Sequence, residues 1–371
     1  MIDYINKLNT TWKQGAGSVY LAQEPICPWF FRCSSTYACL ERIGMPNNTT
    51  DMTPRPRPFC QVIDGVKRCP LITRERLDDI MKFVPLKGDV LQLSYPKAGS
   101  HWIQFTVQTI IRGGEAVESY DDFTTVTCFL DYVGLQDWER PSSTPLGLYM
   151  SHVLPPLENF NSEAKYIYVA RNPWDCCVSF YHMVKELDIY SFREGCFDDF
   201  FECFIEGDFG YGDYFEHLLY GYGLRNRSNV LFLTYEEMKT DCRGTVFRIA
   251  RFLGKHYAKD LEENTQLLQS LLDKLTVERT RGILVLNLAG HKNPKIDAKI
   301  KERNLTASEG FQGCSTMLPF VRKGEIGGWK DYFSSVQLLR MEETIARKTS
   351  GSDVMNIWAD MREEARRLSK K

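Results

Sequence analysis

Three short apolar segments, each followed at once by a helical pattern, restrict the fold of this chain more than any other feature. The apolar segments read DVLQLSY (89–95), AKYIYVA (164–170) and NVLFLTY (229–235). The helical patterns that follow them span residues 101–114, 171–187 and 236–254. Continuous apolar runs are typical of strands buried on both faces, and strand–helix alternation is typical of a parallel sheet. We therefore predict an α/β fold, a single domain with a central parallel β-sheet flanked by helices on both faces.

The N-terminal part of the sequence differs from this regular pattern. Residues 1–58 show no sustained period and end in alternating prolines, so we expect a loosely attached extension there. Residues 59–371 form the predicted α/β domain. Within it, residues 284–315 are polar and weakly periodic, which favours a long loop or lid.

Composition bounds the possible functions. The formal net charge is -2, which argues against a globally basic surface for nucleic acid, so any anion site has to be built locally. No window approaches ~18 uncharged apolar residues, and the first residues lack the basic start and apolar block of a secretion signal. The 12 cysteines have no zinc-type spacing, and cytosolic thiols usually stay reduced. We expect a cytoplasmic protein with no metal, nucleic-acid or membrane partner.

The first apolar segment runs into the sequence YPKAGSHW (95–102). This segment offers backbone N–H groups at a helix start, the amine of Lys97 and the hydroxyl of Ser100, while Gly99 lets the main chain approach a ligand closely. Such a turn favours a phosphate or sulfate oxygen. An ordinary strand–helix turn with a solvated lysine is an equal alternative. A nucleotide kinase is disfavoured, because the Gly-Lys-Ser/Thr ending of a nucleotide-hydrolase loop is absent.

Two later segments add cations. In YVARNPWDCCVSFYHM, Arg171 directly follows a strand, and Ser179 lies eight residues on, about two helical turns along the same side of the next helix. In VRKGEIGGWKDYF, Arg322 and Lys323 precede Gly324, as a loop that closes over an anion requires. Taken alone, the first of these segments is better explained by an arginine that ties a loop to the sheet, and the second has a solvated basic turn as its alternative. Their joint occurrence in this order favours a dianionic phosphate site.

These three motifs resemble those of the cytosolic sulfotransferases, which transfer a sulfuryl group from 3′-phosphoadenosine 5′-phosphosulfate (PAPS) to a hydroxyl or an amine. The likeness runs from about residue 59 to the region after 333, and with its N-terminal extension the chain resembles an arthropod-like member. YPKAGSHW is similar to the family's 5′-phosphosulfate loop, YVARNPWDCCVSFYH to its 3′-phosphate element and RKGEIGGWK to its closing loop. The resemblance implies a P-loop-like sulfotransferase fold, PAPS as cofactor, PAP as product, a small-molecule acceptor and no metal.

The resemblance also implies roles for single residues. Lys97 would contact the oxygen that bridges phosphate and sulfate, and Trp102 would stack on adenine. The other cofactor-binding residues that it implies are Ala98, Gly99, Ser100, His101, Arg171, Ser179, Tyr235, Thr276, Arg322, Lys323 and Gly324. His152, in LYMSHVLPPLENF, matches the family's base, although a lone histidine before prolines is more often structural.

Acceptor specificity is less constrained by the sequence. The implied acceptors are a phenol, an aromatic amine, a steroid or an alcohol, and aromatic side chains suit such compounds. Core packing is the equal alternative for each candidate. The candidate acceptor-binding residues are Phe123, Phe129 and Tyr181.

Some positions depart from the family's pattern. Met150 stands where many members carry a lysine, so stabilisation of the sulfuryl oxygens would be weaker. His101 replaces a threonine, and it would either donate a hydrogen bond to the 5′-phosphate or, if protonated, partly replace the missing charge. Val277 replaces a stacking phenylalanine. A catalytically weak or silent PAPS- or PAP-binding member is therefore the alternative. The family's dimer motif is degraded after Lys330, so we expect a monomer or a weak homodimer.

Overall fold

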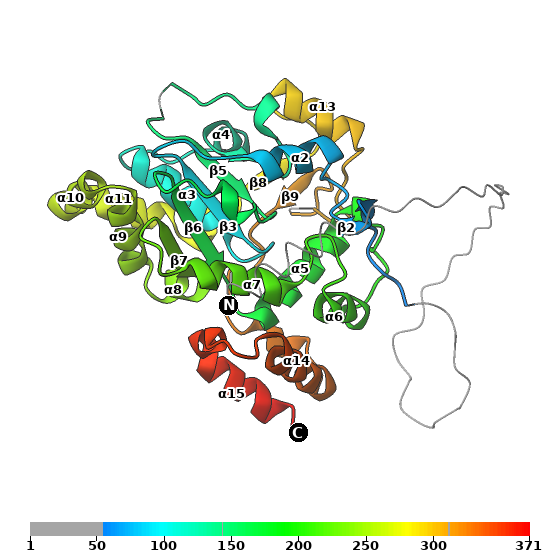
Figure 1. The fold of residues 1–371 in the computed structure, drawn as a ribbon. Helices are drawn as coiled ribbons and strands as arrows, with labels where there is room; N and C mark the ends of the chain where they lie inside the picture. The colour runs from blue at the N-terminus through cyan, green and yellow to red at the C-terminus, as the bar shows by residue number, and fades with distance from the viewer. Residues whose placement is uncertain (1–54, 143, 311) are drawn as a thin grey trace, which may run out of the picture. The chain divides into compact units, whose positions relative to one another are not determined.

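The structure is a computed structural model that describes residues 55–142, 144–310 and 312–371. Of the predicted extension, residues 1–54 lie outside the described residues. Pro56–Lys371 form one compact unit, which is built around a five-stranded parallel sheet with the order β4-β5-β3-β6-β7 (Figure 1). Its strands are β3 (Val90–Ser94), β4 (Cys128–Phe129), β5 (Leu148–Ser151), β6 (Lys165–Ala170) and β7 (Val230–Thr234).

The central strands are buried on both faces, as their continuous apolar sequences predict. All five residues of β3 are buried, and in β6 only Lys165 is partly exposed. The three predicted strands are β3, β6 and β7, and the prediction of a parallel sheet is confirmed. The short strands β4 and β5 were not predicted, because two and four residues carry no readable period.

The chain reverses its direction of travel across the sheet at β3. From β3 it moves to one side to form β4 and β5, and then to the other side to form β6 and β7. Crossovers between parallel strands are right-handed, so the connections of the two halves lie on opposite faces. α3 (Ser100–Ile111), which follows β3, packs against that strand and against α9 (Cys242–Leu253), which comes after the last strand of the sheet. α7 (Tyr214–Leu224), from the connection between β6 and β7, contacts β3 and β7. Such a reversal leaves a crevice at the carboxyl ends of the strands, where ligands bind in open α/β sheets.

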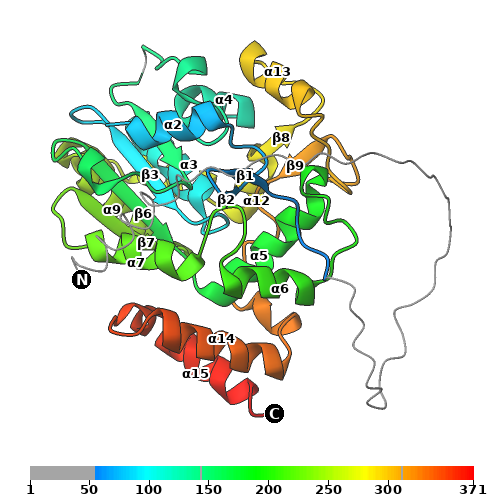
Figure 2. The ribbon, with the colours of Figure 1, turned by 45° about the vertical axis from the view of Figure 1, so that its right-hand side comes forward.

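The predicted helical patterns correspond to α3, to α5 (Pro173–Glu186) and to the pair α8 (Tyr235–Thr240) and α9. The other helices are α2 (Arg74–Lys82), α4 (Tyr120–Val126), α6 (Phe197–Glu206), α10 (Lys255–Glu263), α11 (Thr265–Lys274), α12 (Val277–Ile283), α13 (Pro294–Glu302), α14 (Ser335–Lys348) and α15 (Ala359–Leu368), together with α7. The 3₁₀-helices are η1 (Leu135–Asp137), η2 (Leu157–Asn159), η3 (Asp188–Tyr190), η4 (Gly328–Asp331) and η5 (Val354–Trp358). Helix α14 packs against α15 and against α6 and α7 (Figure 2).

The segment 284–315 is more regular than the predicted long loop. It contains β8 (Val285–Asn287), which pairs antiparallel with β9 (Met317–Pro319), and the nine-residue helix α13. Asn293 caps α13 by accepting a hydrogen bond from the backbone of Lys295. The loop prediction was wrong here, because the many charged residues of α13 hide an Asn-Pro helix start and one apolar pair four residues apart. A second small antiparallel pair joins β1 (Gln61–Ile63) to β2 (Val66–Arg68).

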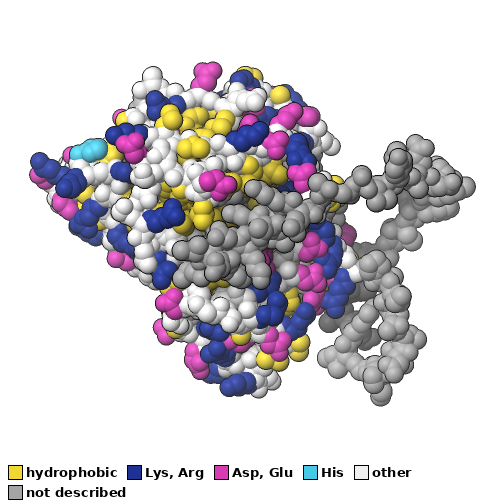
Figure 3. All heavy atoms as spheres, in the orientation of Figure 1, with side chains coloured by type: hydrophobic (Ala, Val, Ile, Leu, Met, Phe, Trp, Pro, Cys, Tyr) yellow, Lys and Arg dark blue, Asp and Glu magenta, His cyan; other side chains and the backbone are white. Residues whose placement is uncertain are grey.

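The surface carries both signs of charge. On the face drawn in Figure 3, basic and acidic side chains are interspersed, in keeping with the formal net charge of -2. None of the helices within the described ranges has the length and apolar character needed to cross a bilayer. In the same ranges, no three His, Cys, Asp or Glu side chains gather as a metal site would need.

Candidate active site

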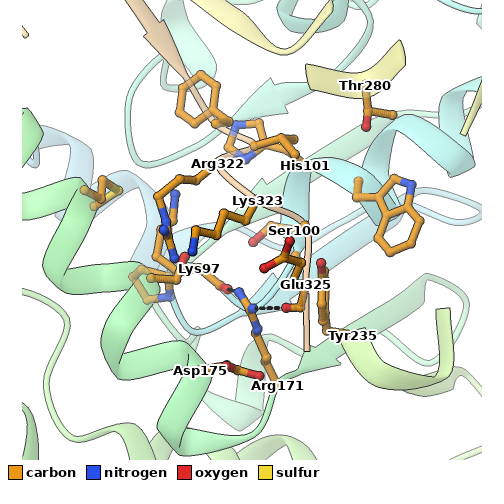
Figure 4. Close-up of a pocket in the computed structure, with 18 of the residues that line it drawn as sticks. Lys97, Ser100, His101, Arg171, Asp175, Tyr235, Thr280, Arg322, Lys323 and Glu325 are labelled. Atoms are coloured by element: carbon orange, nitrogen blue, oxygen red, sulfur yellow. Dashed lines mark hydrogen bonds between the residues drawn. The ribbon is translucent and has the colours of Figure 1, made fainter. Parts of the chain in front are cut away.

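The carboxyl ends of four strands contribute residues to one cavity. Lys97 follows β3, His152 follows β5, Arg171 follows β6 and Tyr235 follows β7. Because these ends lie at one edge of the sheet, residues that are far apart in the sequence meet there (Figure 4). Most of the predicted site residues line this cavity. They are Lys97, Gly99, Ser100, His101, Trp102, Phe129, His152, Arg171, Ser179, Tyr235, Arg322, Lys323 and Gly324.

Two predicted cofactor residues lie outside the lining of this cavity. Ala98 is buried in the turn after β3, and its N–H donates to the carbonyl of Tyr95 at 3.2 Å. Thr276 is the exposed N-cap of α12, and its hydroxyl donates to the carbonyl of Asp273 at 3.2 Å. One helical turn later, Thr280 lines the cavity in its place. Sequence reasoning chose Thr276 and missed Thr280. The two threonines are four residues apart and lie on the same face of the helix, so the sequence does not show which of them reaches the cavity.

Two predicted acceptor residues also lie elsewhere. Phe123 is fully buried, and its ring stacks on His101 at a centroid distance of 5.5 Å. Tyr181 is buried against Phe197, with an edge-to-face ring contact at 5.5 Å. For both side chains the structure shows core packing, which was the alternative.

The turn after β3 is shaped for a close approach of main chain to a ligand. Lys97 and Gly99 have φ angles of 69° and 99°, a backbone region that a Cβ atom disfavours. A Cβ on Gly99 would lie 2.8 Å from Cδ2 of Tyr235, so only glycine fits without a shift. No side chain caps the first turn of α3. Its leading N–H groups are therefore left for an anion, at the positive end of the helix dipole.

Positive charge accumulates around this turn. Arg171 donates from Nη1 to the carbonyl of Lys97 at 3.2 Å and from Nη2 to that of Glu325 at 3.1 Å, and its guanidinium lies 4.3 Å from the Tyr235 ring centre. Its Nε is buried and has no partner among the described residues. Burial, followed by the charges of Arg171 and Arg322, lowers the pKa of Lys97 to about 8. A buried donor without a partner and mutually repelling cations both call for an anion.

The basic segment near the C-terminus is fixed by a carboxylate on α5. Oδ2 of Asp175 accepts the N–H of Gly327 at 2.8 Å, and Oδ1 accepts that of Trp329 at 3.1 Å. Gly324 has a φ of 69°, and a Cβ there would lie 2.7 Å from Cγ1 of Val277. Val277 thus packs closely on the segment that carries the two cations. In Figure 4 the basic side chains of this segment and of the β3 turn end close together.

His152 presents a neutral ring to the cavity. Its Nδ1 lies 2.8 Å from the carbonyl oxygen of Ser94. A carbonyl only accepts hydrogen bonds, so Nδ1 carries the proton and Nε2 keeps its lone pair. Burial lowers the pKa of His152 to about 4, against an opposing effect of the Ser94 hydrogen bond, and Lys97 lowers it further. The ring can therefore accept a proton at neutral pH.

A buried carboxylate that sequence reasoning missed holds the backbone next to this ring. Asp131 has no exposed surface, and burial raises its pKa to about 6. Its Oδ2 accepts the N–H of His152 at 2.9 Å, and its Oδ1 accepts the hydroxyl of Ser151 at 2.7 Å. The sequence shows only that Asp131 is an acidic residue directly after an apolar pair. This pattern gains a functional meaning only when the fold places β4 beside β5.

Two departures from the family pattern take a definite form in the structure. The ring of His101 stacks on that of Phe320 at 4.1 Å, and its Nε2 lies 3.3 Å from the Tyr120 hydroxyl. Burial, followed by His152 and Lys97, holds the pKa of His101 well below its usual range. Of the two roles considered for His101, the desolvation of the ring beside other basic groups disfavours the protonated form and leaves the hydrogen bond to the 5′-phosphate. Met150, 1% exposed, lies within the sheet rather than in the cavity wall.

A second cavity of about 550 Å³ adjoins the first. The two cavities share Phe129, Tyr132, Met183 and Phe320 in their walls. Only Phe129 was predicted among these four. The others come from a loop, from the far half of α5 and from the residue after β9, and only the fold brings them together.

The fold and the site together define a class of α/β proteins that bind an anionic group where a parallel sheet reverses its strand order. Residues 87–353 match the sequence model of a family described as "Sulfotransferase domain". The chain therefore belongs to this family of transferase enzymes, and the resemblance predicted from its motifs is confirmed.

Relatives and solved structures agree with this membership. The chain is 30% identical to the amine sulfotransferase of Oryctolagus cuniculus, over 78% of this chain and 89% of that protein. It is 30% identical to the 3-alpha-hydroxysteroid sulfotransferase of Cavia porcellus, over 76% and 90%. A mouse sulfotransferase complexed with PAP shares the fold with a TM-score of 0.58 and 22% identity, over 81% of this chain and 99% of that chain.

Proposed function

We propose that this protein transfers the sulfuryl group of PAPS to a hydroxyl or an amine of a small acceptor, with His152 as the base. One observation carries the proposal: His152 lines a cavity rich in cations that shares its wall with a larger cavity. A negatively charged donor and an apolar acceptor thereby meet beside a neutral ring that can take up a proton. The sulfotransferases among its relatives support the same activity.

The cationic cavity fits PAPS by the chemistry of its donors. The unpartnered Nε of Arg171, the free N–H groups that open α3 and the cations of the C-terminal segment suit phosphate oxygens. Relatives of the same fold have been solved with PAP. The residues that we propose to hold the cofactor are Gly99, Ser100, His101, Trp102, Arg171, Ser179, Tyr235, Thr280, Arg322, Lys323 and Gly324. Thr280 takes the place expected for Thr276.

Lys97 and His152 carry the chemistry in this proposal. Bound PAPS supplies an activated sulfuryl group. Lys97 neutralises the charge that develops on the phosphate oxygen as that group departs, which is electrostatic stabilisation of the transition state. Nε2 of His152 takes the proton of the attacking hydroxyl or amine, an effect worth about 10²- to 10⁴-fold in rate. The proposal needs no metal ion, because cations of the chain itself face the leaving group.

The larger cavity is the proposed acceptor site. A volume of about 550 Å³ lies within the range of small-molecule sites. Phe129 and Tyr132 line it beside His152, and edge-to-face contact of Phe129 with the His152 ring at 5.2 Å places apolar surface next to the base. Such a wall suits a phenol, an aromatic amine, a steroid or an alcohol.

Incubation of the protein with radiolabelled PAPS and a panel of phenols, amines and steroids tests this proposal. We expect labelled product, and its loss in His152→Ala with PAP affinity retained, because a base acts on the acceptor rather than on the nucleotide. His256→Ala is the matched control, since His256 is exposed and lies outside the cavity. Full transfer by His152→Ala would refute the base role, and loss of PAP affinity would assign the ring to cofactor binding.

The same assay decides between transfer and binding alone. Met150 is apolar and buried where many family members carry a lysine, an observation that favours a weak or silent PAPS- or PAP-binding member as the second candidate. Tight PAP binding without transfer to any acceptor would establish that candidate.

The setting of the enzyme is part of the proposal. We propose a cytoplasmic protein whose domain spans residues 59–371, which acts as a monomer or a weak homodimer. All nine cysteines of the described ranges are free thiols, which agrees with a reducing compartment. Leu339, which stands at a position of the family's dimer motif, is half exposed.

A further inference from the structure

The acceptor cavity has a basic wall that takes no part in the cationic cavity. This wall is built from the start of α2 and from the region of α13, and it contains Arg76, Lys299 and Arg303. None of the three lines the cofactor cavity. A phosphate bound at the cofactor site therefore does not contact these three cations, and they remain available to a molecule in the acceptor cavity.

Two of these cations lack a carboxylate partner. Lys299 pairs with Asp137 and also donates to the carbonyl of Val133 at 2.8 Å. Within the described ranges, Arg76 and Arg303 form no ion pair. Arg76 donates one long hydrogen bond of 3.4 Å to the carbonyl of Asp131, and Arg303 donates to that of Pro70. A hydrogen bond to a neutral carbonyl leaves the charge of a guanidinium in place.

The two guanidiniums also oppose each other. Burial lowers the pKa of Arg76 most, the charge of Asp137 raises it, and the charge of Arg303, a smaller effect, lowers it, while Asp131 acts in the same direction as Asp137. Thr73, the N-cap of α2, lines the same cavity and brings the positive end of a nine-residue helix to it. The positive end of this helix therefore lies at the same wall as the two guanidiniums.

Carboxylates also occur in the lining, but none of them is paired with Arg76 or Arg303. Glu75 and Glu302 are exposed, Asp79 is half-buried, and Asp137 pairs with Lys299. None of the four forms an ion pair with either guanidinium in the described chain. The two guanidiniums thus line the cavity without a carboxylate partner.

We propose that the acceptor site selects amphipathic acids: acceptors with an apolar body, a hydroxyl or an amine that receives the sulfuryl group, and a separate carboxylate that binds Arg76 and Arg303. The inference rests on the proposed function for the receiving group and on the basic wall for the carboxylate. A carboxylate matches the fork of a guanidinium, and charge-assisted hydrogen bonds exceed neutral ones in strength.

Matched ligands separate the carboxylate from the rest of the acceptor. The probes are hydroxyphenylbutanoic acid and its methyl ester, each titrated calorimetrically into the protein saturated with PAP, so that no transfer is needed for the reading. We expect the acid to bind roughly 10- to 100-fold more tightly, the effect of one charged hydrogen-bonded pair. Equal binding, or tighter binding of the ester, would overturn the inference.

Substitutions of the two arginines test whether they cause the preference for the acid over the ester. Arg76→Gln and Arg303→Gln should each reduce the preference for the acid and leave binding of the ester unchanged, whereas a merely structural loss would weaken both ligands. Lys301→Gln is the matched control, because Lys301 lies on α13, pairs with Asp297 and is absent from the cavity wall. A preference that survives in both arginine variants would also overturn the inference.

The design keeps the two proposals apart. A preference for the acid without sulfotransfer to any acceptor would refute the proposed function and leave the basic wall as the ligand selector. Sulfotransfer to neutral phenols together with equal binding of acid and ester would keep the function and refute the selection of acids.

Discussion

The backbone N–H of His152 donates a hydrogen bond of 2.9 Å to Oδ2 of Asp131, a carboxylate with no exposed surface. The other oxygen of this carboxylate accepts the hydroxyl of Ser151. Asp131 follows β4, and His152 follows β5, so one side chain ties the ends of two neighbouring strands together. The ring itself is oriented separately by the carbonyl of Ser94. The position of His152 is therefore fixed at both its backbone and its side chain.

Replacement of Asp131 by asparagine should lower kcat more than it weakens PAP binding. An amide keeps the volume but accepts at only one of the two sites, so one buried donor loses its partner. A displacement of the base of this kind costs about 10- to 100-fold in kcat. The measurement is steady-state kinetics beside calorimetric PAP titration. Asp78→Asn, at a half-exposed site on α2, is the control. If PAP affinity falls in parallel with kcat, the carboxylate supports the whole turn rather than the base.

The acid limb of the pH profile should lie near the lowered pKa of His152. Burial brings this pKa to about 4, so the ring stays neutral above that value and gains its proton only as the pH falls through it. The value of kcat/KM for an alcohol acceptor should hold its plateau down to about pH 5 and then fall. A limb near the usual histidine value of about 6.5 would show a solvated ring. A limb near 6 that disappears in Asp131→Asn would belong to Asp131 instead.

The alkaline limb should report Lys97. Burial and two neighbouring guanidiniums lower its pKa to about 8, so its positive charge is lost as the pH rises through that value. The value of kcat/KM for PAPS reports the free enzyme and should fall in the same range. Lys97→Arg should be slower at every pH but lack this limb, because arginine stays protonated. An unchanged alkaline limb in this variant would assign the titration to another group.

Sequence and structure agree best where chemistry restricts the residue type. Strands β3 and β6 could be predicted because burial on both faces demands continuous apolar sequence. Lys97, Arg171 and Arg322 could be found because binding of phosphate demands cations beside flexible turns. Each of these demands acts within a few neighbouring residues.

The periodicity of helix α5 explains why Tyr181 was wrongly chosen as an acceptor-binding residue, and its use would have avoided that error. Ser179 on α5 lines the cofactor cavity. Residues two apart on a helix differ by about 200°, and residues four apart by about 40°. Ser179 therefore predicts that Met183 faces the same way and that Tyr181 faces away, as the structure shows.

Other members of the site depend on contacts that no local pattern encodes. Phe320 follows β9 and stacks on His101 of α3, more than two hundred residues earlier in the chain. Arg76 reaches the acceptor cavity from α2, before the first strand of the central sheet. A single sequence carries no signal for such pairs, because their proximity results from the order of strands in the sheet.

Gly99→Ala should cost both stability and PAP affinity. Its φ of 99° is unfavourable for alanine, and the new Cβ would lie 2.8 Å from Cδ2 of Tyr235, which itself supports Arg171. Backbone strain of this kind costs about 1–3 kcal/mol, and displacement of Tyr235 adds a loss at the cofactor site. Thermal unfolding and PAP titration measure the two effects.

A second glycine supplies the matched control for this substitution. Gly113, at the end of α3, has a φ of 63°, and a Cβ added there would meet no heavy atom of the described residues within 4 Å. Gly113→Ala should therefore lower stability by about 1–2 kcal/mol and leave PAP affinity unchanged. Equal effects of both substitutions on PAP affinity would show that strain alone, without the contact to Tyr235, governs the phosphate-binding turn.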